Sequence, residues 1–387
     1  MRPVTSPADL RVALFSGNYN YVRDGANQAL NRLVEYLLRQ GAAVRVYSPT
    51  VRNPAFPPTG DLVSIPSVAF PGDRGEYRFP LWLGGEVKRD LEAFRPNIMH
   101  LSSPDFAARR ALAWAKAHGL PVLGSVHTRF ETYPRYYGFG FLEPLVLGIV
   151  KGVYTHCDAL VAPSESMAEV LREQGMHDDI AIWARGVDRE IFNPAQRDPV
   201  WRRSLGIADD EVAIGFLGRL VLEKGIDVFA EAVTGLTEQG VPHKVLVIGE
   251  GPAKEAFTQQ VPGAIFAGFQ RGAELGRAVA SMDVLLNPSE TETFGNVTLE
   301  AMACGVPVVA ARATGSTSLV IDGETGVLVE PGNAGAFAAA LSAYITQPAL
   351  RAAHGAAGEL RAGAYSWDAI NGVLASAYLR LLSCRSK

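Results

Sequence analysis

Two successive series of short apolar runs, each run followed by a turn or a helical pattern, dominate this chain of 387 residues. This alternation predicts βαβ units, because parallel strands need a long crossover connection that is usually a helix. The runs lie at residues 12–16, 43–48, 97–103, 121–127, 158–164 and 180–185, then at 213–218, 244–249, 264–269, 283–288, 307–311 and 326–330. The chain is therefore predicted to be an α/β protein with two Rossmann-like, doubly wound parallel sheets.

A polar segment at residues 188–210, which contains two prolines, separates the two series and indicates an interdomain connection. We expect one domain at residues 1–190 and a second at 205–365. The last helical pattern, at 367–387, follows the final strand of the second sheet and is expected to pack back on the first domain. Because doubly wound sheets bind ligands beyond the carboxyl ends of their strands, the two domains are expected to face each other across a cleft.

The composition is that of an ordered globular protein. Apolar residues make up 48% and charged residues 20% of the chain, which excludes intrinsic disorder. The 36 basic residues nearly balance the 40 acidic ones, and a net charge of -4 gives no general attraction to nucleic acid. The three cysteines, Cys157, Cys304 and Cys384, lie far apart without C-x-x-C spacing, which argues against a disulfide framework and against a cysteine-based zinc site.

No segment of the sequence has the pattern of a signal peptide or of a membrane-spanning helix. The first apolar run is short and lacks a small-residue cleavage site. The longest apolar stretch, residues 139–154, contains Glu143 and Lys151 and falls short of the roughly 18 consecutive apolar residues that a spanning helix needs. We therefore expect a cytoplasmic protein.

The loop after the first strand of the second series carries two cations beside a helix start. Arg219 and Lys224 lie within the segment 218–225, which begins and ends with glycine. Backbone N–H groups at a helix N-terminus, together with nearby cations, can hold an anion. The same two side chains could equally be solvated surface charges.

A second loop, residues 288–295, joins a later strand to a helix and carries Glu292, and Glu300 follows about a turn and a half into that helix. The two carboxylates are too far apart to share one proton, but each can accept hydrogen bonds from hydroxyl groups of an elongated ligand. Two cations and two carboxylates together fit a nucleotide sugar. The helix start at Gly295 adds N–H groups for a phosphate.

These motifs resemble those of the retaining, nucleotide-sugar-dependent glycosyltransferases of the GT-B fold, the glycosyl transferases group 1. The resemblance covers nearly the whole chain and rests on GRLVLEKG at 218–225, GEGP at 249–252 and ETFGNVTLEAMACGVPVVA at 292–310. It implies a hexosyltransferase that acts with retention at the anomeric carbon. It also implies no cofactor and no divalent metal, because the two cations neutralise the donor diphosphate.

The same resemblance implies a role for each residue of the donor site. Arg219 and Lys224 would neutralise the diphosphate, and Glu292 would bind hydroxyls of the donor sugar. Glu300 would bind the ribose, and backbone N–H groups of Phe294 and Gly295 would face sugar or phosphate. The residues implied to bind the donor are Gly25, Arg219, Lys224, Glu292, Thr293, Phe294, Gly295, Asn296 and Glu300, of which Arg219, Lys224 and Glu292 are also implied to be catalytic.

Two residues of the first domain are further candidates. His127 follows a strand of the first series, although a lone histidine in such a place is more often structural. The resemblance implies that His127 reaches the donor sugar and is catalytic. Gly25 would let the backbone approach the donor phosphates closely, but the family commonly has two adjacent glycines where this chain has Asp24 and Gly25.

The stretch after His127 mixes aromatic residues with arginines and is the candidate acceptor site, with Arg129, Arg135, Tyr136 and Tyr137 as its expected residues. Together with Asp24, Gly25 and the segment 183–188, it is similar to members of the family that glycosylate membrane lipids, including GDP-mannose-dependent α-mannosyltransferases and sulfoquinovosyl-diacylglycerol synthases. This similarity favours mannose as the sugar, a membrane glycolipid or lipid head group as the acceptor, and peripheral contact with the inner membrane face. The apolar stretch 139–154 would then lie at the bilayer interface, or else form a buried amphipathic helix.

Other functions stay open from the sequence. The chain could use a UDP-sugar and a soluble acceptor, could be a sugar-nucleotide epimerase of the same fold, or could bind a nucleotide sugar without turnover. A dinucleotide-dependent dehydrogenase is disfavoured, because Gly17, Asn18 and Tyr19 stand where the G-x-G-x-x-G fingerprint would follow the first strand.

Overall fold

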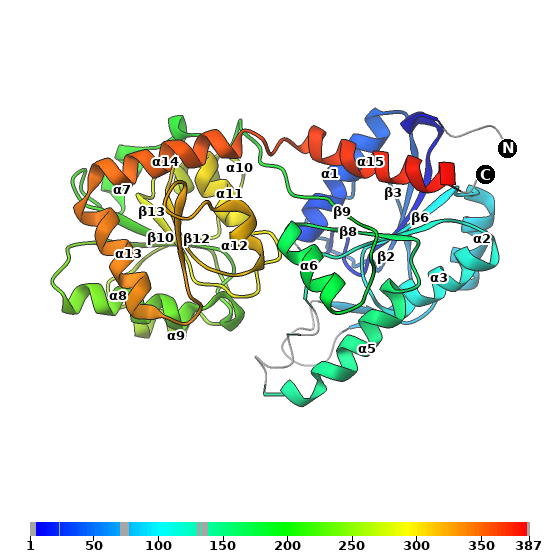
Figure 1. The fold of residues 1–387 in the computed structure, drawn as a ribbon, viewed down its shortest axis with the longest axis horizontal. Coiled ribbons are helices and arrows are strands. Elements are labelled where there is room, and N and C mark those ends of the chain that lie inside the picture. The colour runs from blue at the N-terminus through cyan, green and yellow to red at the C-terminus, as the bar shows by residue number, and fades with distance from the viewer. Residues whose placement is uncertain (1–4, 23, 70–76, 130–131, 133–137, 385–387) are drawn as a thin grey trace. The chain divides into compact units, whose positions relative to one another are not determined.

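The computed structural model describes residues 5–22, 24–69, 77–129, 132 and 138–384. It divides the chain into two compact units, one formed by Met1–Gly186 with Trp367–Lys387 and the other by Val187–Ser366. Each unit is built around its own parallel sheet (Figure 1). The predicted fold class of two parallel-sheet α/β domains is confirmed.

The first unit contains a seven-stranded parallel sheet in the part of the chain that is described. Its strands are β1 (Arg11–Phe15), β2 (Ala43–Ser48), β3 (Asp61–Ser64), β6 (Ile98–Leu101), β7 (Val122–Ser125), β8 (Ala159–Ala162) and β9 (Ile180–Ile182). Their order is β3-β2-β1-β6-β7-β8-β9, and β6, β7 and β8 are buried along their whole length, as expected for a parallel sheet covered by helices. The order turns back at β1, which lies between β2 and β6.

Helices and short turns surround this sheet. They are η1 (Pro7–Asp9), α1 (Gly25–Arg39), α2 (Gly85–Phe94), α3 (Phe106–Ala117), η4 (Gly140–Leu142), α5 (Glu143–Tyr154), α6 (Glu165–Glu173) and α15 (Trp367–Cys384). α1 begins where the Asp24 carboxylate accepts a hydrogen bond from the backbone N–H of Asn27, an N-cap that satisfies a free donor of the first turn. An antiparallel pair, β4 (Ser67–Ala69) and β5 (Arg78–Pro80), lies outside the main sheet.

The second unit contains a six-stranded parallel sheet, counted over its described residues, in the order β12-β11-β10-β13-β14-β15. The strands are β10 (Ala213–Leu217), β11 (Lys244–Ile248), β12 (Ile265–Gly268), β13 (Val284–Asn287), β14 (Val308–Ala311) and β15 (Gly326–Val329). The helices and turns are η5 (Pro194–Gln196), α7 (Pro199–Ser204), η6 (Leu222–Lys224), α8 (Ile226–Glu238), α9 (Lys254–Gln260), α10 (Gly272–Ala280), α11 (Asn296–Ala303), α12 (Thr314–Leu319), α13 (Ala334–Thr346) and α14 (Pro348–Ala362). Here the strand order turns back at β10, between β11 and β13.

The C-terminal helix α15 belongs to the first unit, where it contacts α1 and β9 (Figure 1). Asn371 is fully buried, accepts a hydrogen bond from Trp183 Nε1 at 3.1 Å and donates one to the Arg32 carbonyl at 3.2 Å. A Cβ atom on Gly186 would lie 2.6 Å from the Trp367 ring, so only glycine fits where the chain passes the start of α15.

The segment 188–210, interpreted from sequence as an interdomain connection, folds as part of the second unit instead. Arg202 in α7 is only 2% exposed and donates to the Asp283 carboxylate at 2.9 Å and to the Glu211 carbonyl at 2.7 Å. These charge-assisted hydrogen bonds anchor the segment to the sheet, because removing one partner would leave a buried charge unpaired. The prolines that suggested a linker begin η5 and α7, where a missing N–H costs nothing.

Candidate functional site

The candidate donor site of the second unit lies beyond the carboxyl ends of β10 and β13. These strands are neighbours in the sheet, at the point where the strand order turns back, so the loops that follow them meet at one edge. The loop after β10 contains η6 with Lys224, and the loop after β13 contains Glu292. Parallel topology thus brings together two motifs that are 68 residues apart in sequence.

Three contacts tie the two loops together. The Ser289 and Thr291 hydroxyls donate hydrogen bonds to the Glu223 carbonyl at 3.1 and 3.2 Å. Beside them the Lys224 ammonium forms an ion pair with the Glu292 carboxylate, and these side chains are 30% and 12% exposed. Lys224 and Glu292 therefore keep a surface that a ligand can reach.

Two glycines in the left-handed backbone region begin the helices behind these loops. Gly225 has φ 68° at the start of α8, and Gly295 has φ 94° at the start of α11, a conformation that other L-residues adopt only with strain. Gly295 thereby leads the chain from the Glu292 loop into α11, whose first residue is Asn296. Phe294 is buried against Tyr365, whereas Thr293 is partly exposed.

Glu300 lies in α11 and keeps part of its surface exposed. Burial, together with the nearby Glu292 carboxylate, raises the pKa of Glu300 to about 8. At neutral pH in the unliganded protein this carboxyl therefore carries a proton, and it can donate as well as accept a hydrogen bond.

Arg219 lies in the same loop as Lys224 but is exposed. The loop is backed by the glycine-rich turn after β11, where a Cβ on Gly249 would collide with the Gly218 carbonyl and one on Gly251 with the Leu220 carbonyl. The Leu220 N–H donates to the Glu250 carbonyl at 3.0 Å. The glycines of both motifs thus allow the two backbones to touch, which fixes the loop that carries Arg219.

In the first unit His127 lies two residues after the end of β7 and is 8% exposed. Its Nδ1 accepts a hydrogen bond from the Arg185 guanidinium at 2.7 Å, and its Nε2 lies 2.8 Å from the Ser125 hydroxyl. Burial, then the charges of Arg185 and His100, hold the pKa of His127 well below its ordinary value. The ring is neutral, and it would have to release one of these two partners before a nitrogen could bond to a sugar. Gly25, partly exposed, is the first residue of α1.

Comparison with known proteins places this geometry in a family. Residues 211–347 match the family "Glycosyl transferases group 1", and residues 23–191 match "Glycosyltransferase Family 4". A GDP-mannose-dependent alpha-mannosyltransferase of Corynebacterium glutamicum is 30% identical over 83% of this chain and 77% of its own length. The chain belongs to the group 1 glycosyltransferases.

Two further proteins are similar to this glycosyltransferase. A sulfoquinovosyl transferase of Arabidopsis thaliana is 34% identical over 65% of this chain, and the match covers 50% of the length of that relative. The structure of a sucrose-phosphate synthase from Thermosynechococcus elongatus superposes with a TM-score of 0.80 at 21% identity, over 96% of this chain and 99% of the other. The fold is that of the GT-B glycosyltransferases.

The candidate acceptor residues of the glycosyltransferase are described only in part. Arg129 is partly exposed in the loop after β7, and Arg135, Tyr136 and Tyr137 lie outside the described residues. Beyond them α5 packs one face inward through Val150, Val153 and Tyr154. Its other face, with the preceding turn, is apolar and exposed, at Phe139, Phe141, Leu145 and Ile149. The amphipathic helix with one buried face is confirmed, whereas contact of the exposed face with a bilayer stays a prediction.

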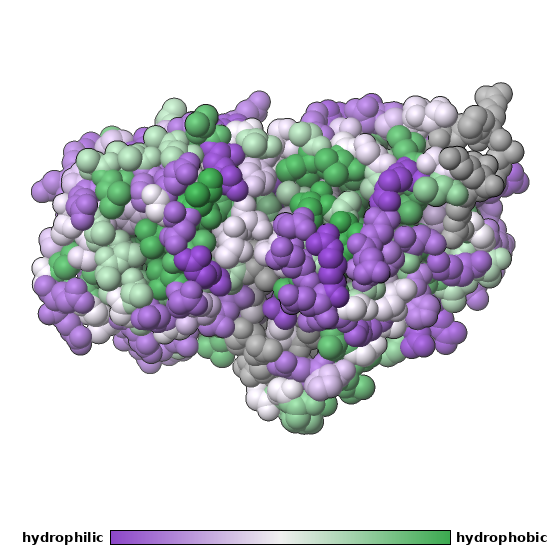
Figure 2. All heavy atoms as spheres, viewed as in Figure 1, coloured by the Kyte–Doolittle hydropathy of each residue, from purple (hydrophilic) through white to green (hydrophobic). Residues whose placement is uncertain are grey.

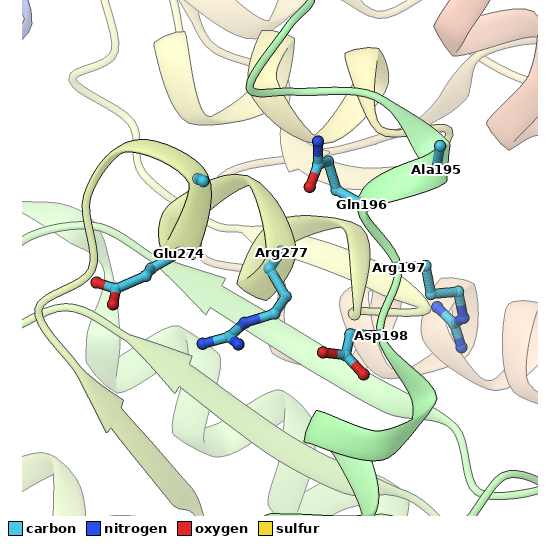
Figure 3. A pocket seen from close by; sticks show the side chains of 7 residues that line it. Ala195, Gln196, Arg197, Asp198, Glu274 and Arg277 are labelled. Atoms are coloured by element: carbon cyan, nitrogen blue, oxygen red, sulfur yellow. The ribbon is translucent and has the colours of Figure 1, made fainter.

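A shallow pocket of the second unit involves none of the predicted donor residues (Figure 3). It is lined by residues of the 195–198 segment and of α10, with Gln196, Arg197, Asp198, Glu274 and Arg277 as its polar side chains. Arg197 donates to Asp283 at 2.7 Å and Asp198 accepts from the Trp201 N–H at 2.9 Å, so these two charges stabilise the unit.

Within the described residues, no helix is long and apolar enough to cross a bilayer.

The sequence did not predict which residues would bond to His127. Arg185 and Ser125 bond to its ring, and His100 bonds to the same serine. A usable signal was present for two of them, because His100 and Ser125 are polar residues within otherwise apolar strands. Such a residue must find a hydrogen-bond partner when it is buried.

Proposed function

We propose that this glycosyltransferase moves a hexose, with mannose as the first candidate, from a nucleotide-sugar donor to a membrane glycolipid or lipid head group. The ion pair between Lys224 and Glu292 carries the proposal, because it sets a cation for phosphate beside an acceptor for sugar hydroxyls. The names of the relatives support mannose and a lipid acceptor: they include GDP-mannose-dependent alpha-mannosyltransferases and an alpha-monoglucosyldiacylglycerol synthase.

In the proposed reaction the leaving group is a nucleoside diphosphate that gains negative charge as the glycosidic bond breaks. Lys224 and Arg219 stabilise that charge, which is the kind of preorganised electrostatic effect that lowers a barrier most. Because two cations do this, we propose that no divalent metal is needed. The resemblance to retaining glycosyltransferases leads us to propose also that the anomeric configuration is retained. Glu292 accepts hydrogen bonds from the donor sugar while Lys224 turns from Glu292 to phosphate.

The remaining donor contacts follow from position. In our proposal Glu300 binds the ribose hydroxyls, and the backbone at Thr293, Phe294, Gly295 and Asn296 faces sugar and phosphate at the start of α11. Gly25, at the start of α1, provides a similar N-terminus in the first unit. His127 stays neutral near the donor sugar.

The donor site is tested by melting the full-length protein with GDP-mannose, UDP-glucose, GDP or UDP, each with and without EDTA. A ligand that binds only the folded protein raises the melting temperature. We expect stabilisation by the guanine series that EDTA does not change. A response to the uracil series would replace mannose by the UDP-sugar alternative, and no response to any nucleotide would contradict the proposal.

Variants locate the binding. Lys224→Ala removes a charge-assisted hydrogen bond to phosphate and should weaken donor binding by about 10- to 100-fold. Arg203→Ala is the matched control, because Arg203 pairs with Asp209 on the exposed surface of α7. Turnover of the donor without an acceptor, to an epimeric sugar nucleotide, would favour the epimerase alternative.

A lipid acceptor is supported by the exposed apolar face of α5. Leu145 and Ile149 are 62% and 47% exposed and four residues apart, so they share one face of α5, and Phe141 in the preceding turn η4 is 77% exposed. Figure 2 shows apolar atoms at the lower edge of the view, where Figure 1 places the start of α5. Exposed apolar residues gathered in this way mark an interaction surface.

Flotation with anionic vesicles tests this contact. The double variant Phe141→Ser and Leu145→Ser should leave the vesicle fraction, while activity on a water-soluble acceptor is kept. Leu360→Ser, which changes a side chain of α14 that is 83% exposed, is the control and should float as the wild type does. A wild-type protein that stays in the bottom fraction would rule out membrane contact through α5.

A further inference from the structure

A buried chain of hydrogen bonds connects the C-terminal helix to His127. The Tyr378 hydroxyl in α15 lies 2.6 Å from His100 Nδ1, and His100 Nε2 lies 2.7 Å from the Ser125 hydroxyl. Ser125 then contacts His127 Nε2 at 2.8 Å. Tyr378, His100 and Ser125 are fully buried. The chain crosses from helix to β6 and from β6 to the end of β7.

Arg185 determines which ring nitrogen of His127 carries the proton. A guanidinium has donors and no acceptor, so His127 Nδ1, which faces Arg185 at 2.7 Å, must be the unprotonated nitrogen. The proton of the neutral ring is therefore on Nε2, where it is donated to the Ser125 oxygen. The ring orientation of His127 consequently depends on where Ser125 is held.

Packing around the chain restricts its members. The Trp183 ring lies edge-on to His100 and to His127, with centroid distances of 6.1 and 5.5 Å. Arg185 stacks on the same tryptophan at 5.0 Å. A second contact from α15 holds this ring, because Asn371 accepts the Trp183 N–H. The helix thus fixes both the polar chain and the aromatic wall beside it.

We propose that Tyr378 is a positioning residue for His127 and acts through His100 and Ser125. The inference rests on the proposed function, in which His127 lies near the donor sugar. Without the Tyr378 hydroxyl, His100 Nδ1 loses its partner in a site that excludes water, and an unsatisfied buried nitrogen is costly. His100 then has to change its hydrogen bond to Ser125. This change weakens the hydrogen bond between Ser125 and His127 that orients the His127 ring.

Tyr378→Phe tests this proposal, because it removes the hydroxyl and keeps the ring. The chain offers a matched control in Tyr344→Phe: Tyr344 is fully buried and lies 2.7 Å from His354 Nδ1, but in the second unit. Two measurements are compared in full-length protein labelled with ¹⁵N-histidine. The first is the imidazole nitrogen spectrum, which reports which nitrogen of His127 carries the proton and how strongly it is bonded. The second is kcat and KM for the donor.

For Tyr378→Phe we expect the His127 nitrogen signals to shift and kcat to fall by about three- to tenfold at unchanged KM, while Tyr344→Phe changes neither. Unchanged His127 signals, or shifted signals with a kcat equal to that of Tyr344→Phe, would overturn the proposal. Ser125→Ala breaks the chain one link closer to His127 without altering α15, and it should give the same result if Tyr378→Phe fails to fold.

The two measurements separate this inference from the proposed function. Wild-type signals with the Nε2 proton on His127, in a protein that transfers no hexose from any donor, would overturn the proposed function and the positioning role with it. A protein that transfers hexose, but whose Tyr378→Phe and Ser125→Ala variants keep wild-type kcat, would overturn the positioning role alone.

Discussion

Lys224 and Glu292 neutralise each other in the unliganded protein, although each is proposed to bind a different part of the donor. Their side chains are 30% and 12% exposed, so a ligand can reach the pair. A donor would supply a new partner for each charge, so neither charge is left unpaired when the ion pair opens.

We predict that Glu292→Gln lowers kcat by about 100-fold and leaves the unfolding free energy within about 1 kcal/mol of wild type. The amide keeps the shape but removes the negative charge and replaces one acceptor oxygen by an NH2 donor. Steady-state kinetics and urea denaturation measure the two effects. Glu290→Gln, an exposed change in the same loop, is the control. Full turnover in Glu292→Gln would remove this residue from the site.

Glu300 gives a prediction about pH. The pKa of Glu300 in the folded protein is about 8, which is above the ordinary value of a glutamate. At a pH between these two values, the folded protein keeps a proton on Glu300 that the unfolded chain has lost. Stability from this group is present at low pH and is lost as pH rises toward 8. Melting between pH 5 and 9 should therefore fall more steeply for wild type than for Glu300→Gln, whereas exposed Glu324→Gln should follow wild type. Parallel curves for all three proteins would contradict the assignment.

At the scale of single elements, α8 and α11 both begin at a glycine in the left-handed region. An alanine in place of Gly295 cannot adopt φ 94° without strain, so α11 would begin differently and the Glu292 loop would shift.

We predict that Gly295→Ala destabilises the protein by about 1–2 kcal/mol and also weakens donor binding. Gly235→Ala, in the interior of α8, is the comparison. A Cβ there would meet Ala338 only at 3.7 Å, so we expect no loss of stability and a gain of up to about 1 kcal/mol from helix propensity. Denaturant titration measures the unfolding free energy of both variants. An equal change in the two variants would show that the left-handed start of α11 is not required.

The elements themselves show what could be read from the sequence. Apolar runs with helical spacers were enough for the two parallel sheets, because burial on both faces leaves a clear pattern. β3 was not predicted, since Asp61–Ser64 is short and exposed at both ends. The chain through Tyr378, His100 and Ser125 was out of reach as well, because it joins α15 to β6 and β7 through side-chain distances that no local pattern encodes.

On the scale of the whole molecule, the chain leaves the first unit at Gly186 and returns to it at Trp367. Buried contacts attach the returning helix, α15, to the first unit. Asn371 satisfies both Trp183 Nε1 and the Arg32 carbonyl, whereas the Arg39 and Asp368 side chains that pair nearby are 53% and 63% exposed.

We predict that Asn371→Ala lowers the unfolding free energy by about 2–3 kcal/mol, because two buried groups lose their partner. Asp368→Asn, which breaks the exposed pair, should cost less than about 1 kcal/mol. Urea denaturation followed by Trp fluorescence measures both variants. A larger loss in Asp368→Asn than in Asn371→Ala would mean that surface charge, and not the buried amide, docks α15.

Because the first unit is built from two separate stretches of the chain, its two parts are synthesised at different times. Domains of a nascent chain commonly fold as units from the N-terminus onward. Here all of residues 187–366 are translated before α15, whose Tyr378 and Asn371 complete the first unit. The whole sequence of the second unit is therefore made before α15, so the second unit can fold before the first unit is complete.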